Sequence, residues 1–322
     1  MIRETAYPAV DLTEVPVFVI MIREKGDGGT MHKHAYLIMA HGSWGILEKL
    51  LRLLDAEYND FYLHIDVKAK NVPDITAWLS HSKLRFIEPT DVRWADYSQS
   101  NVELRLLDAA LRHGGYSYFH LLSGVDLPLK PAREIYDFFE SSGKNFLGFD
   151  ENHPCLKWSK TYHPLVELPV YRKHKAFKAV DRAMHYAQLA VGVNRHRRCD
   201  WTVMHGFNWF SIREEAASCV IAHEDKLKKM FEKTIGSDEM FLQTVFYNCG
   251  LMDTLYDRDV YRGCVRSIDW KRGTPYVWGS TPGKEDDDFR ELTESPNLFA
   301  RKFDERHMEI VDRIYHTLSA AE

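Results

Sequence analysis

The stretch Ala35-Tyr-Leu-Ile-Met-Ala40 is a continuous run of six apolar residues, which is the length of a β-strand. A run without polar interruption is typical of a parallel strand that is buried on both faces. After this run, leucines recur at helical spacing through 44–54. The segment Phe61-Tyr-Leu-His-Ile65 is a second run of strand length. This order predicts an α/β fold with an open, mostly parallel twisted sheet and helices on both of its faces.

The same alternation of strands and helices continues along the chain. Further strands are predicted at 84–87, 116–122, 145–149, 205–212 and 260–268. Further helices are predicted at 73–80, 99–112, 131–140, 175–190, 213–223, 224–234, 238–248 and 304–319. Residues 1–30 stand apart, because Gly26-Asp-Gly-Gly29 interrupts the chain before the regular pattern begins at Met31. We therefore expect a peripheral N-terminal extension over 1–30 and a single domain over 31–322.

Composition and charge narrow the class of protein. The chain has 322 residues, a net charge of −5 and five cysteines without CxxC spacing. A nucleic-acid binder needs a basic surface to displace counterions from phosphate, so the negative charge argues against that class. The cysteine pattern predicts neither a disulfide framework nor a zinc site and indicates a reducing compartment. Without an apolar run of roughly 18 residues or the order of a signal peptide, the sequence predicts a soluble, cytoplasmic protein.

Polar residues follow three of the predicted strands at the point where each strand ends. They are His41 after the first strand, Asp66 and Lys68 after the second, and Asp126 after the strand at 116–122. In open α/β sheets, ligands bind beyond the carboxyl ends of the strands, where a carboxylate can bind a ribose or a base edge. The alternative is that such an aspartate caps a helix or closes a turn.

Glu239 lies in Gly236-Ser-Asp-Glu-Met240, at the start of the helix predicted over 238–248. A carboxylate held at a helix start near the mouth of the sheet can abstract a proton from a sugar hydroxyl. The alternative is an ordinary helix N-terminus, in which Ser237 is the cap and two acids favour the helix dipole.

Arg301 and Lys302 are adjacent cations with aromatic neighbours in the segment 297–304. Two adjacent positive charges can neutralise a leaving diphosphate, or they can form a solvated basic turn before the last helix. The chain has no GxGxxG after its first strand, no GxxxxGK[ST], no HExxH and no GxSxG. These absences argue against dinucleotide enzymes, P-loop proteins, metalloproteases and α/β-hydrolases.

Seven short motifs follow one another along the chain. They are Ala35-Tyr-Leu-Ile-Met-Ala-His41, His64-Ile-Asp-Val-Lys68, Leu121-Leu-Ser-Gly-Val-Asp-Leu-Pro-Leu-Lys130, Gly206-Phe-Asn-Trp-Phe-Ser211, Ser237-Asp-Glu239, Ile268-Asp-Trp270 and Phe299-Ala-Arg-Lys-Phe-Asp304. With these motifs the sequence resembles the core-2/I-branching β-1,6-N-acetylglucosaminyltransferases, whose relatives include the peptide O-xylosyltransferases. Each motif is short, but seven in the family's order make the resemblance specific.

The resemblance implies a GT-A type fold and an inverting displacement on a UDP-sugar. Glu239 matches the family's catalytic base, and Lys302 matches the basic residue that contacts the donor diphosphate in place of a metal. Asp66 matches a carboxylate near the nucleoside, and Trp270 falls where the family places an aromatic ring beside the acceptor. We assign neighbouring residues accordingly: His41, Lys68 and Asp126 to the nucleoside, Arg301 to the diphosphate, and Trp209 to the acceptor.

The family's second diphosphate cation aligns poorly here. Lys271, Arg272 and Lys284 are candidates, and we select Arg272. The resemblance also divides the domain into a nucleotide-sugar half, about 31–150, and an acceptor half, about 151–322.

Most GT-A enzymes hold a divalent metal with an Asp-x-Asp at a strand end. Here Asp257-Arg-Asp259 lies before a predicted strand, at its wrong end, and Asp286-Asp-Asp288 lies where acids cap a helix. We therefore expect metal-independent transfer, without a cofactor other than the UDP-sugar donor.

The expected reaction forms a β-linkage between a sugar, in the first place N-acetylglucosamine, and a hydroxyl of a glycan or glycolipid acceptor. Alternatives are a UDP-xylose, UDP-glucose or UDP-galactose donor, an inactive carbohydrate-binding relative, or a glycoside hydrolase that pairs Asp238 or Glu239 with a second carboxylate. The animal enzymes carry a membrane anchor and disulfides that are not found here. A bacterial-type cytoplasmic enzyme is therefore expected, associated with the inner face of the membrane through a lipid-linked acceptor.

Overall fold

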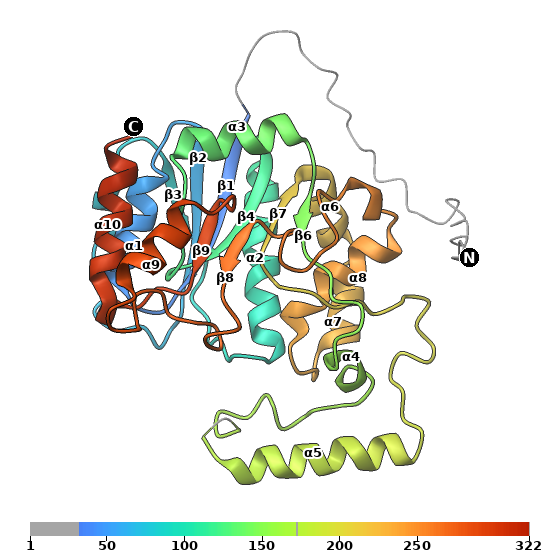
Figure 1. Cartoon of the computed structure of the whole chain (residues 1–322). Helices are drawn as coiled ribbons and strands as arrows, with labels where there is room; N and C mark the ends of the chain where they lie inside the picture. Colours follow the sequence, from blue (N-terminus) through green and yellow to red (C-terminus); the bar gives the residue numbers. More distant parts are fainter. Residues whose placement is uncertain (1–31, 172, 322) are drawn as a thin grey trace, which may run out of the picture. The chain divides into compact units, whose positions relative to one another are not determined.

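The central sheet has six strands in the order β3-β2-β1-β4-β7-β6 (Figure 1). Their bounds are Lys83–Phe86 for β3, Asn59–Ile65 for β2, Lys33–Ala40 for β1, Tyr116–Ser123 for β4, Phe210–Arg213 for β7 and Phe146–Leu147 for β6. The first four strands run parallel, while β7 is antiparallel to both β4 and β6. The predicted open, mostly parallel sheet is confirmed.

The computed structural model describes residues 32–171 and 173–321. The extension predicted over 1–30 lies outside the described residues. The domain boundaries expected from the sequence, and the division at about residue 150, stay predictions.

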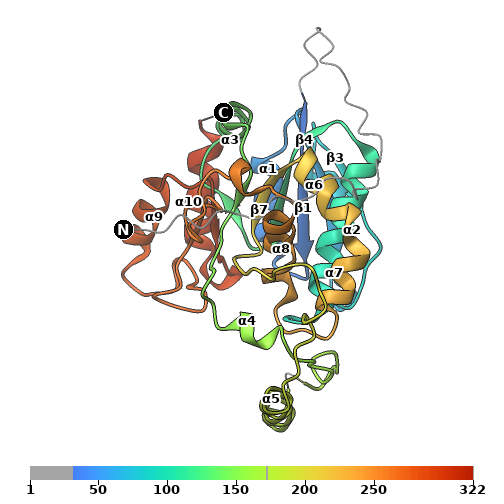
Figure 2. The same cartoon turned by 90° about the vertical axis from the view of Figure 1, so that its right-hand side faces the viewer.

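Helices cover both faces of the sheet, as Figure 2 shows. Tyr36 and Ile38 of β1 face a core formed with α1 (Trp44–Leu53), α3 (Ala132–Ser142) and α10 (Met308–Ser319). Ala35 and Leu37 face the opposite core, formed with α2 (Tyr97–His113), α6 (Glu214–Ala222), α7 (Glu224–Phe231) and α8 (Phe241–Asn248). Since successive strand residues point to opposite faces, a run that is apolar throughout is what this double burial requires.

A second sheet of three short strands brings the C-terminal part of the chain to the end of β4. Its order is β5-β9-β8, with bounds Leu127–Pro128, Phe299–Arg301 and Arg266–Ile268. The backbone N–H of Phe303 donates to the carbonyl of Val125 over 3.0 Å. The helix α9 (Glu285–Thr293) precedes β9, and the turns η4 (Met252–Thr254) and η5 (Glu305–His307) lie in connecting segments.

The segment between β6 and β7 contains α4 (Cys155–Trp158) and α5 (Lys175–Ala190). The helix predicted over 175–190 is confirmed. Both views draw α5 apart from the two helix layers (Figures 1 and 2).

Several predicted elements are shorter than expected. The helix expected over 73–80 is a 3₁₀ turn, η2 (Ile75–Trp78), whose N-cap Asp74 accepts from the N–H of Thr76. The strand expected over 205–212 begins only at Phe210, and the strand expected over 260–268 begins only at Arg266. Close backbone contacts explain part of this: a Cβ on Gly206 would lie 1.9 Å from the carbonyl oxygen of Gly148, so the chain enters β7 through an irregular segment.

Candidate active site

The carboxyl ends of β1, β2 and β4 meet at one edge of the sheet. The backbone N–H of Asp66 donates to the carbonyl of Ala40, and that of Gly124 donates to the carbonyl of Met39, both over 2.9 Å. A Cβ on Gly124 would lie 3.1 Å from the Cβ of Ala40, so these strand ends are in close contact. The predicted nucleoside residues therefore lie along this edge: His41, Asp66, Lys68 and Asp126.

Asp126 closes the turn after β4 and also faces a cation. Its carboxylate accepts from the N–H and the hydroxyl of Ser123, each over 2.8 Å. Nη1 of Arg301 lies 3.6 Å from Oδ1 of Asp126, and the Arg301 guanidinium lies 3.8 Å from the centre of the Trp209 ring. Arg301 thus contacts both a predicted nucleoside residue and a predicted acceptor residue.

Arg301 and Lys302 have unused bonding capacity. Nη1 of Arg301 is buried without a hydrogen bond, and burial lowers the pKa of Arg301 while Asp126 opposes that shift. Lys302 is half-buried, and within 32–171 and 173–321 no carboxylate lies at ion-pair distance from its ammonium. Arg301 at this edge, and Lys302 next to it in sequence, are thus two cations whose donors the described residues do not fully engage.

Asp66 and Lys68 are instead bound to each other and to a loop. The Asp66 carboxylate accepts from the N–H of Lys68 over 2.8 Å and from the N–H of Val92 over 3.1 Å. The Lys68 ammonium lies 2.9 Å from Asp66, contacts Asp91 and donates to the carbonyl of Val92 over 2.7 Å. Two carboxylates thus compensate the positive charge of Lys68. These contacts hold the loop after β3 against the end of β2.

His64 supports the same loop, a role that the sequence did not indicate. Its Nε2 accepts from the backbone N–H of Thr90 over 3.0 Å. Burial lowers the pKa of His64 to about 4, so its ring is neutral near pH 7 and keeps a nitrogen that can accept.

Glu239 lies in a 3₁₀ turn, η3 (Ser237–Glu239), rather than in the helix that follows. Its backbone carbonyl accepts from the N–H of Gly206 over 2.9 Å. Oε2 of its carboxylate lies 3.4 Å from Nε2 of His205, and the side chain is 37 % exposed. Glu239 is therefore held by its backbone while its carboxylate stays accessible.

The alternative in which Ser237 caps the helix does not hold, because neither η3 nor α8 has a side-chain cap hydrogen bond. The Ser237 hydroxyl is buried and lies 2.6 Å from the hydroxyl of Ser100 on α2. Gly236 adopts a left-handed conformation with φ 68° at the start of the turn, and α8 begins only at Phe241. The turn is anchored to α2 by side chains, which local sequence patterns do not reveal.

Two buried acids lie beside Glu239. Asp238 accepts from the amide of Gln99 over 2.6 Å, and Glu103 on α2 accepts from the amide of Asn208 over 3.3 Å. Burial, followed by the charge of Glu239, raises the pKa of Asp238 to about 8. Burial, followed by the charge of Asp238, also raises the pKa of Glu103 well above its usual range. Both carboxyls therefore retain protons at a pH at which an ordinary carboxyl has lost them.

The segment 205–209 joins the two parts of the site. Its first residue contacts the Glu239 carboxylate, and its last residue lies against the Arg301 guanidinium. Between them, the ring centre of Phe207 lies 5.9 Å from that of Trp270. Four residue steps span at most roughly 14 Å, so the predicted base, diphosphate and acceptor residues border one short stretch of chain.

Arg272 occupies a different environment from Arg301. It contacts Asp269, lies 2.6 Å from Asp288 and lies 2.9 Å from Glu291. Three carboxylates already compensate its charge, which leaves it less capacity for a further anion than Lys302 has. Trp270, close to it in sequence, is 39 % exposed.

The two Asp-x-Asp sets are engaged by protein donors. Asp257 and Asp259 both interact with Arg262. Asp288 is buried and also accepts from the hydroxyl of Tyr276 over 2.8 Å. The acids at 286–288 lie in the first turn of α9 itself, where they suit the helix dipole.

Two groups in the described part of the chain have donor atoms close enough to hold a metal: His153, Cys155 and His205, and Cys219, His223 and Cys249. The His153 and His205 rings are stacked with their centres 3.9 Å apart, beside Glu239. Burial raises the pKa of Cys155 to about 11. The second group lies between α6 and the end of α8. Spacing along the chain gave no sign of either group, because tertiary contacts bring their members together.

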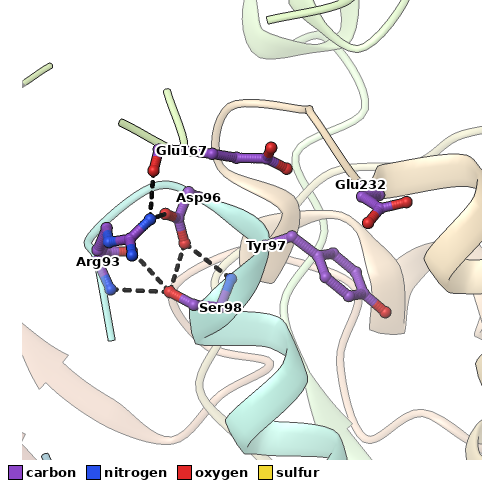
Figure 3. A pocket seen from close by; sticks show the side chains of 6 residues that line it. All are labelled: Arg93, Asp96, Tyr97, Ser98, Glu167 and Glu232. Carbon is purple, nitrogen blue, oxygen red and sulfur yellow. Dashed lines mark hydrogen bonds and ion pairs between the residues drawn. The ribbon is translucent and has the colours of Figure 1, made fainter. Parts of the chain in front are cut away.

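Figure 3 shows a cavity of about 320 Å³ at the start of α2, lined by Arg93, Asp96, Tyr97, Ser98, Glu167 and Glu232. None of these residues was predicted as a site residue. Arg93 contacts the Glu167 carbonyl, and Ser98 bonds Asp96. Three acidic side chains and one guanidinium line this cavity, so a diphosphate would be repelled from it.

The fold is thus an open, mostly parallel α/β sheet with an accessible carboxylate and a largely buried cation among its candidate site residues. The family model described as Core-2/I-Branching enzyme matches residues 34–293. The chain therefore belongs to the Core-2/I-branching enzyme family, which confirms the resemblance seen in the motifs.

No curated protein matches the chain. Among solved structures, the crystal structure of S. aureus TarS 1-349 is 10 % identical with a TM-score of 0.35, covering 67 % of this chain and 56 % of that one. A further crystal structure of S. aureus TarS is 13 % identical with a TM-score of 0.26, covering 43 % of this chain and 26 % of that one. The chain thus spans less than two thirds of either structure.

Proposed function

We propose that the chain is an inverting glycosyltransferase that moves a sugar, in the first place N-acetylglucosamine, from a UDP-sugar to a hydroxyl of a glycan acceptor. One observation carries this proposal. The accessible Glu239 carboxylate borders one end of the segment 205–209, and the incompletely paired Arg301, which Lys302 follows in the chain, lies against the other. A displacement at a sugar carbon needs a base on the acceptor side and charge compensation on the leaving-group side.

In the proposed reaction, Glu239 accepts the proton of the acceptor hydroxyl as its oxygen attacks the anomeric carbon. The bond from that carbon to the diphosphate oxygen breaks, and its electron pair leaves with UDP. Attack opposite the leaving group inverts the anomeric centre and gives a β-linkage from an α-linked donor. Lys302 and Arg301 neutralise the charge that develops on the diphosphate, which is the role that a divalent cation has in other transferases.

The buried acids support the choice of Glu239 as the base. Burial disfavours the charged forms of both acids: it raises the pKa of Asp238 to about 8 and that of Glu103 well above its usual range. Of the three neighbouring carboxyls, Glu239 is the one whose side chain is accessible. A glycoside hydrolase would need a second accessible carboxylate opposite Glu239, and neither buried neighbour provides it.

Replacing Glu239 by Gln tests the proposal. This change keeps the size of the side chain and removes the basic oxygen, so we expect kcat for UDP release in the presence of acceptor to fall by about 10²–10⁴-fold. Screening UDP-N-acetylglucosamine, UDP-xylose, UDP-glucose and UDP-galactose in the same assay identifies the donor. The control is Glu214→Gln, on the exposed start of α6. Transfer within about tenfold of wild type by folded Glu239→Gln would show that another group is the base.

A further inference from the structure

The helix α5 packs against the rest of the chain through polar side chains. Asp181 is buried, and its Oδ2 lies 2.8 Å from Nδ1 of His163. His185 is also buried; its Nδ1 lies 2.7 Å from the hydroxyl of Thr161, and its ring stacks on Trp158 with centres 4.2 Å apart. A surface helix ordinarily buries its apolar stripe and exposes its polar face. In α5, by contrast, the two buried residues are both polar.

The opposite side of α5 is apolar and exposed. At 3.6 residues per turn, seven positions fall within an arc of about 120° that contains no charged residue. They are Ala176, Ala179, Val180, Ala183, Tyr186, Ala187 and Ala190, all exposed. Val180 is 51 % exposed and Tyr186 is 61 % exposed, and Val191, which follows the helix, is 79 % exposed. We call these eight residues the outer face of α5.

Positive charge surrounds this outer face. Residues 156–200 contain ten lysines and arginines against three acids, a net charge of +7 in a chain whose total is −5. Lys175, Lys178 and Arg182 form a row along one side of the outer face, all three exposed. In the part of the chain that the structure describes, none of these three is ion-paired. The segment is therefore strongly basic on a protein that is acidic elsewhere.

We propose that the outer face of α5 and its basic row bind the surface of an anionic lipid bilayer. A helix with an apolar face flanked by lysine and arginine lies in the plane of the membrane interface, where headgroups attract the cations and apolar side chains leave water. Tyr186 suits this boundary, since its ring is apolar and its hydroxyl is polar. No helix among the described residues has the length and apolar character needed to cross a membrane.

The charge and the apolar side chains of this surface favour an anionic bilayer over two other partners, a soluble polyanion and a second copy of the chain. A soluble polyanion would bind the basic row but would gain little from Val180, Tyr186 and Val191. A second copy of the chain could cover the apolar face, but antiparallel pairing of α5 with itself would bring two rows of Lys175, Lys178 and Arg182 together. An anionic bilayer is complementary to both the charge and the apolar side chains.

The segment that carries α5 begins and ends beside Glu239, the base of the proposed function on which this point rests. The segment leaves the core next to His153, whose ring stacks on His205, and it returns at His205, which contacts Glu239. The two ends of the segment that carries α5 therefore meet beside Glu239.

Vesicle sedimentation of the full chain tests the membrane contact without relying on transfer. We expect binding to vesicles that contain phosphatidylglycerol, weak binding to pure phosphatidylcholine, and release as salt is raised. Changing Lys175, Lys178 and Arg182 together to Gln should weaken binding by about tenfold or more. The pair Val180→Ser and Tyr186→Ser, which keeps every charge, should also weaken it several-fold.

The matched control is Lys228→Gln with Lys229→Gln, two exposed lysines on α7, which should bind as wild type does. All variants change surface residues, and thermal unfolding checks that each variant is folded. The dependence of wild-type binding on salt and on lipid composition tests the proposal without any variant. Equal binding to neutral and anionic vesicles would overturn the proposal. A second result would also overturn it: the double variant Val180→Ser with Tyr186→Ser binds anionic vesicles as wild type does, and wild type binds soluble polyphosphate equally tightly. That result would identify a polyanion site instead. Loss of transfer by Glu239→Gln with vesicle binding retained separates this inference from the proposed function.

Discussion

Identical side chains have different roles in this chain because their surroundings differ. The sequence assigns both Arg272 and Arg301 to the donor diphosphate. In the structure, three carboxylates compensate the charge of Arg272, whereas Nη1 of Arg301 is buried without a hydrogen bond. In the same way Glu239 is accessible, and its neighbour Asp238 is buried and holds a proton. Partner groups and burial, rather than residue type, determine which charges can act on a substrate.

Asp238 makes a prediction about stability and pH. Its folded-state pKa of about 8 exceeds the ordinary value of 3.8. The folded protein therefore binds more protons than the unfolded chain between these values, and the free energy of unfolding should fall as pH rises from about 4 to about 8. Asp238→Asn keeps an acceptor for Gln99 and removes the titration, so its stability should fall less over this range. Urea unfolding at pH 5 and pH 8 measures the difference.

The control for this measurement is Asp253→Asn. Asp253 has a side chain that is 98 % exposed, so the variant should follow the pH dependence of wild type. An unchanged pH dependence in Asp238→Asn would mean that the Asp238 carboxyl is already ionised in the folded protein at pH 5.

Among the elements, the segment 205–209 decides how the site is assembled. Its path depends on Gly206, where an added Cβ would lie 1.9 Å from the carbonyl oxygen of Gly148 and 2.8 Å from the amide of Gln243. The backbone of two segments therefore meets without room for any side chain. The motif containing Gly206 was recognised from sequence, but its predicted strand geometry was wrong because this contact keeps the segment irregular.

Gly206→Ala should lower the free energy of unfolding by about 1–3 kcal/mol or more, because backbone atoms must move to admit the methyl group. The matched control is Gly45→Ala, in α1, where the nearest atom to an added Cβ is 3.4 Å away. That change should be neutral or stabilising by up to about 1 kcal/mol, since alanine favours helix. Chemical denaturation of both variants tests this, and equal stabilities would contradict the close contact.

At the scale of the whole molecule, the site joins distant parts of the chain. The end of β4 contacts the segment after β9, so Asp126 meets Arg301 across 175 residues of sequence. A donor bound there contacts both parts of the fold and should stabilise the molecule as a unit. Binding adds about 2.7 kcal/mol of stability at a ligand concentration one hundred times Kd.

We therefore expect UDP to raise the Tm of wild type in the presence of EDTA, because Lys302 and Arg301 supply the compensating charge. Lys302→Ala should lose most of this shift. Lys144→Ala should keep it, since Lys144 bonds the carbonyl of Asp253 outside the proposed site. A shift, or transfer activity, that disappears with EDTA and returns with Mn²⁺ would contradict the proposal of metal-independent transfer.

Much of the fold could be predicted from the sequence. The runs at 35–40, 61–65 and 116–122 predicted parallel strands, and all three are observed within a few residues. These signals are local, because a strand buried on both faces must be apolar along its length. The order of the motifs was likewise sufficient to identify the family.

The sequence by itself therefore determined the α/β architecture, the family and the set of polar residues at the strand ends. Only the tertiary structure decided which charges are compensated, which carboxyls are buried, how Cys219, His223 and Cys249 come together, and which side of α5 faces outward. The physical reason is that solvation and pairing depend on neighbours far away in sequence. A short motif gives the type of side chain at each position. The charge state of that side chain depends on the groups that folding places around the side chain.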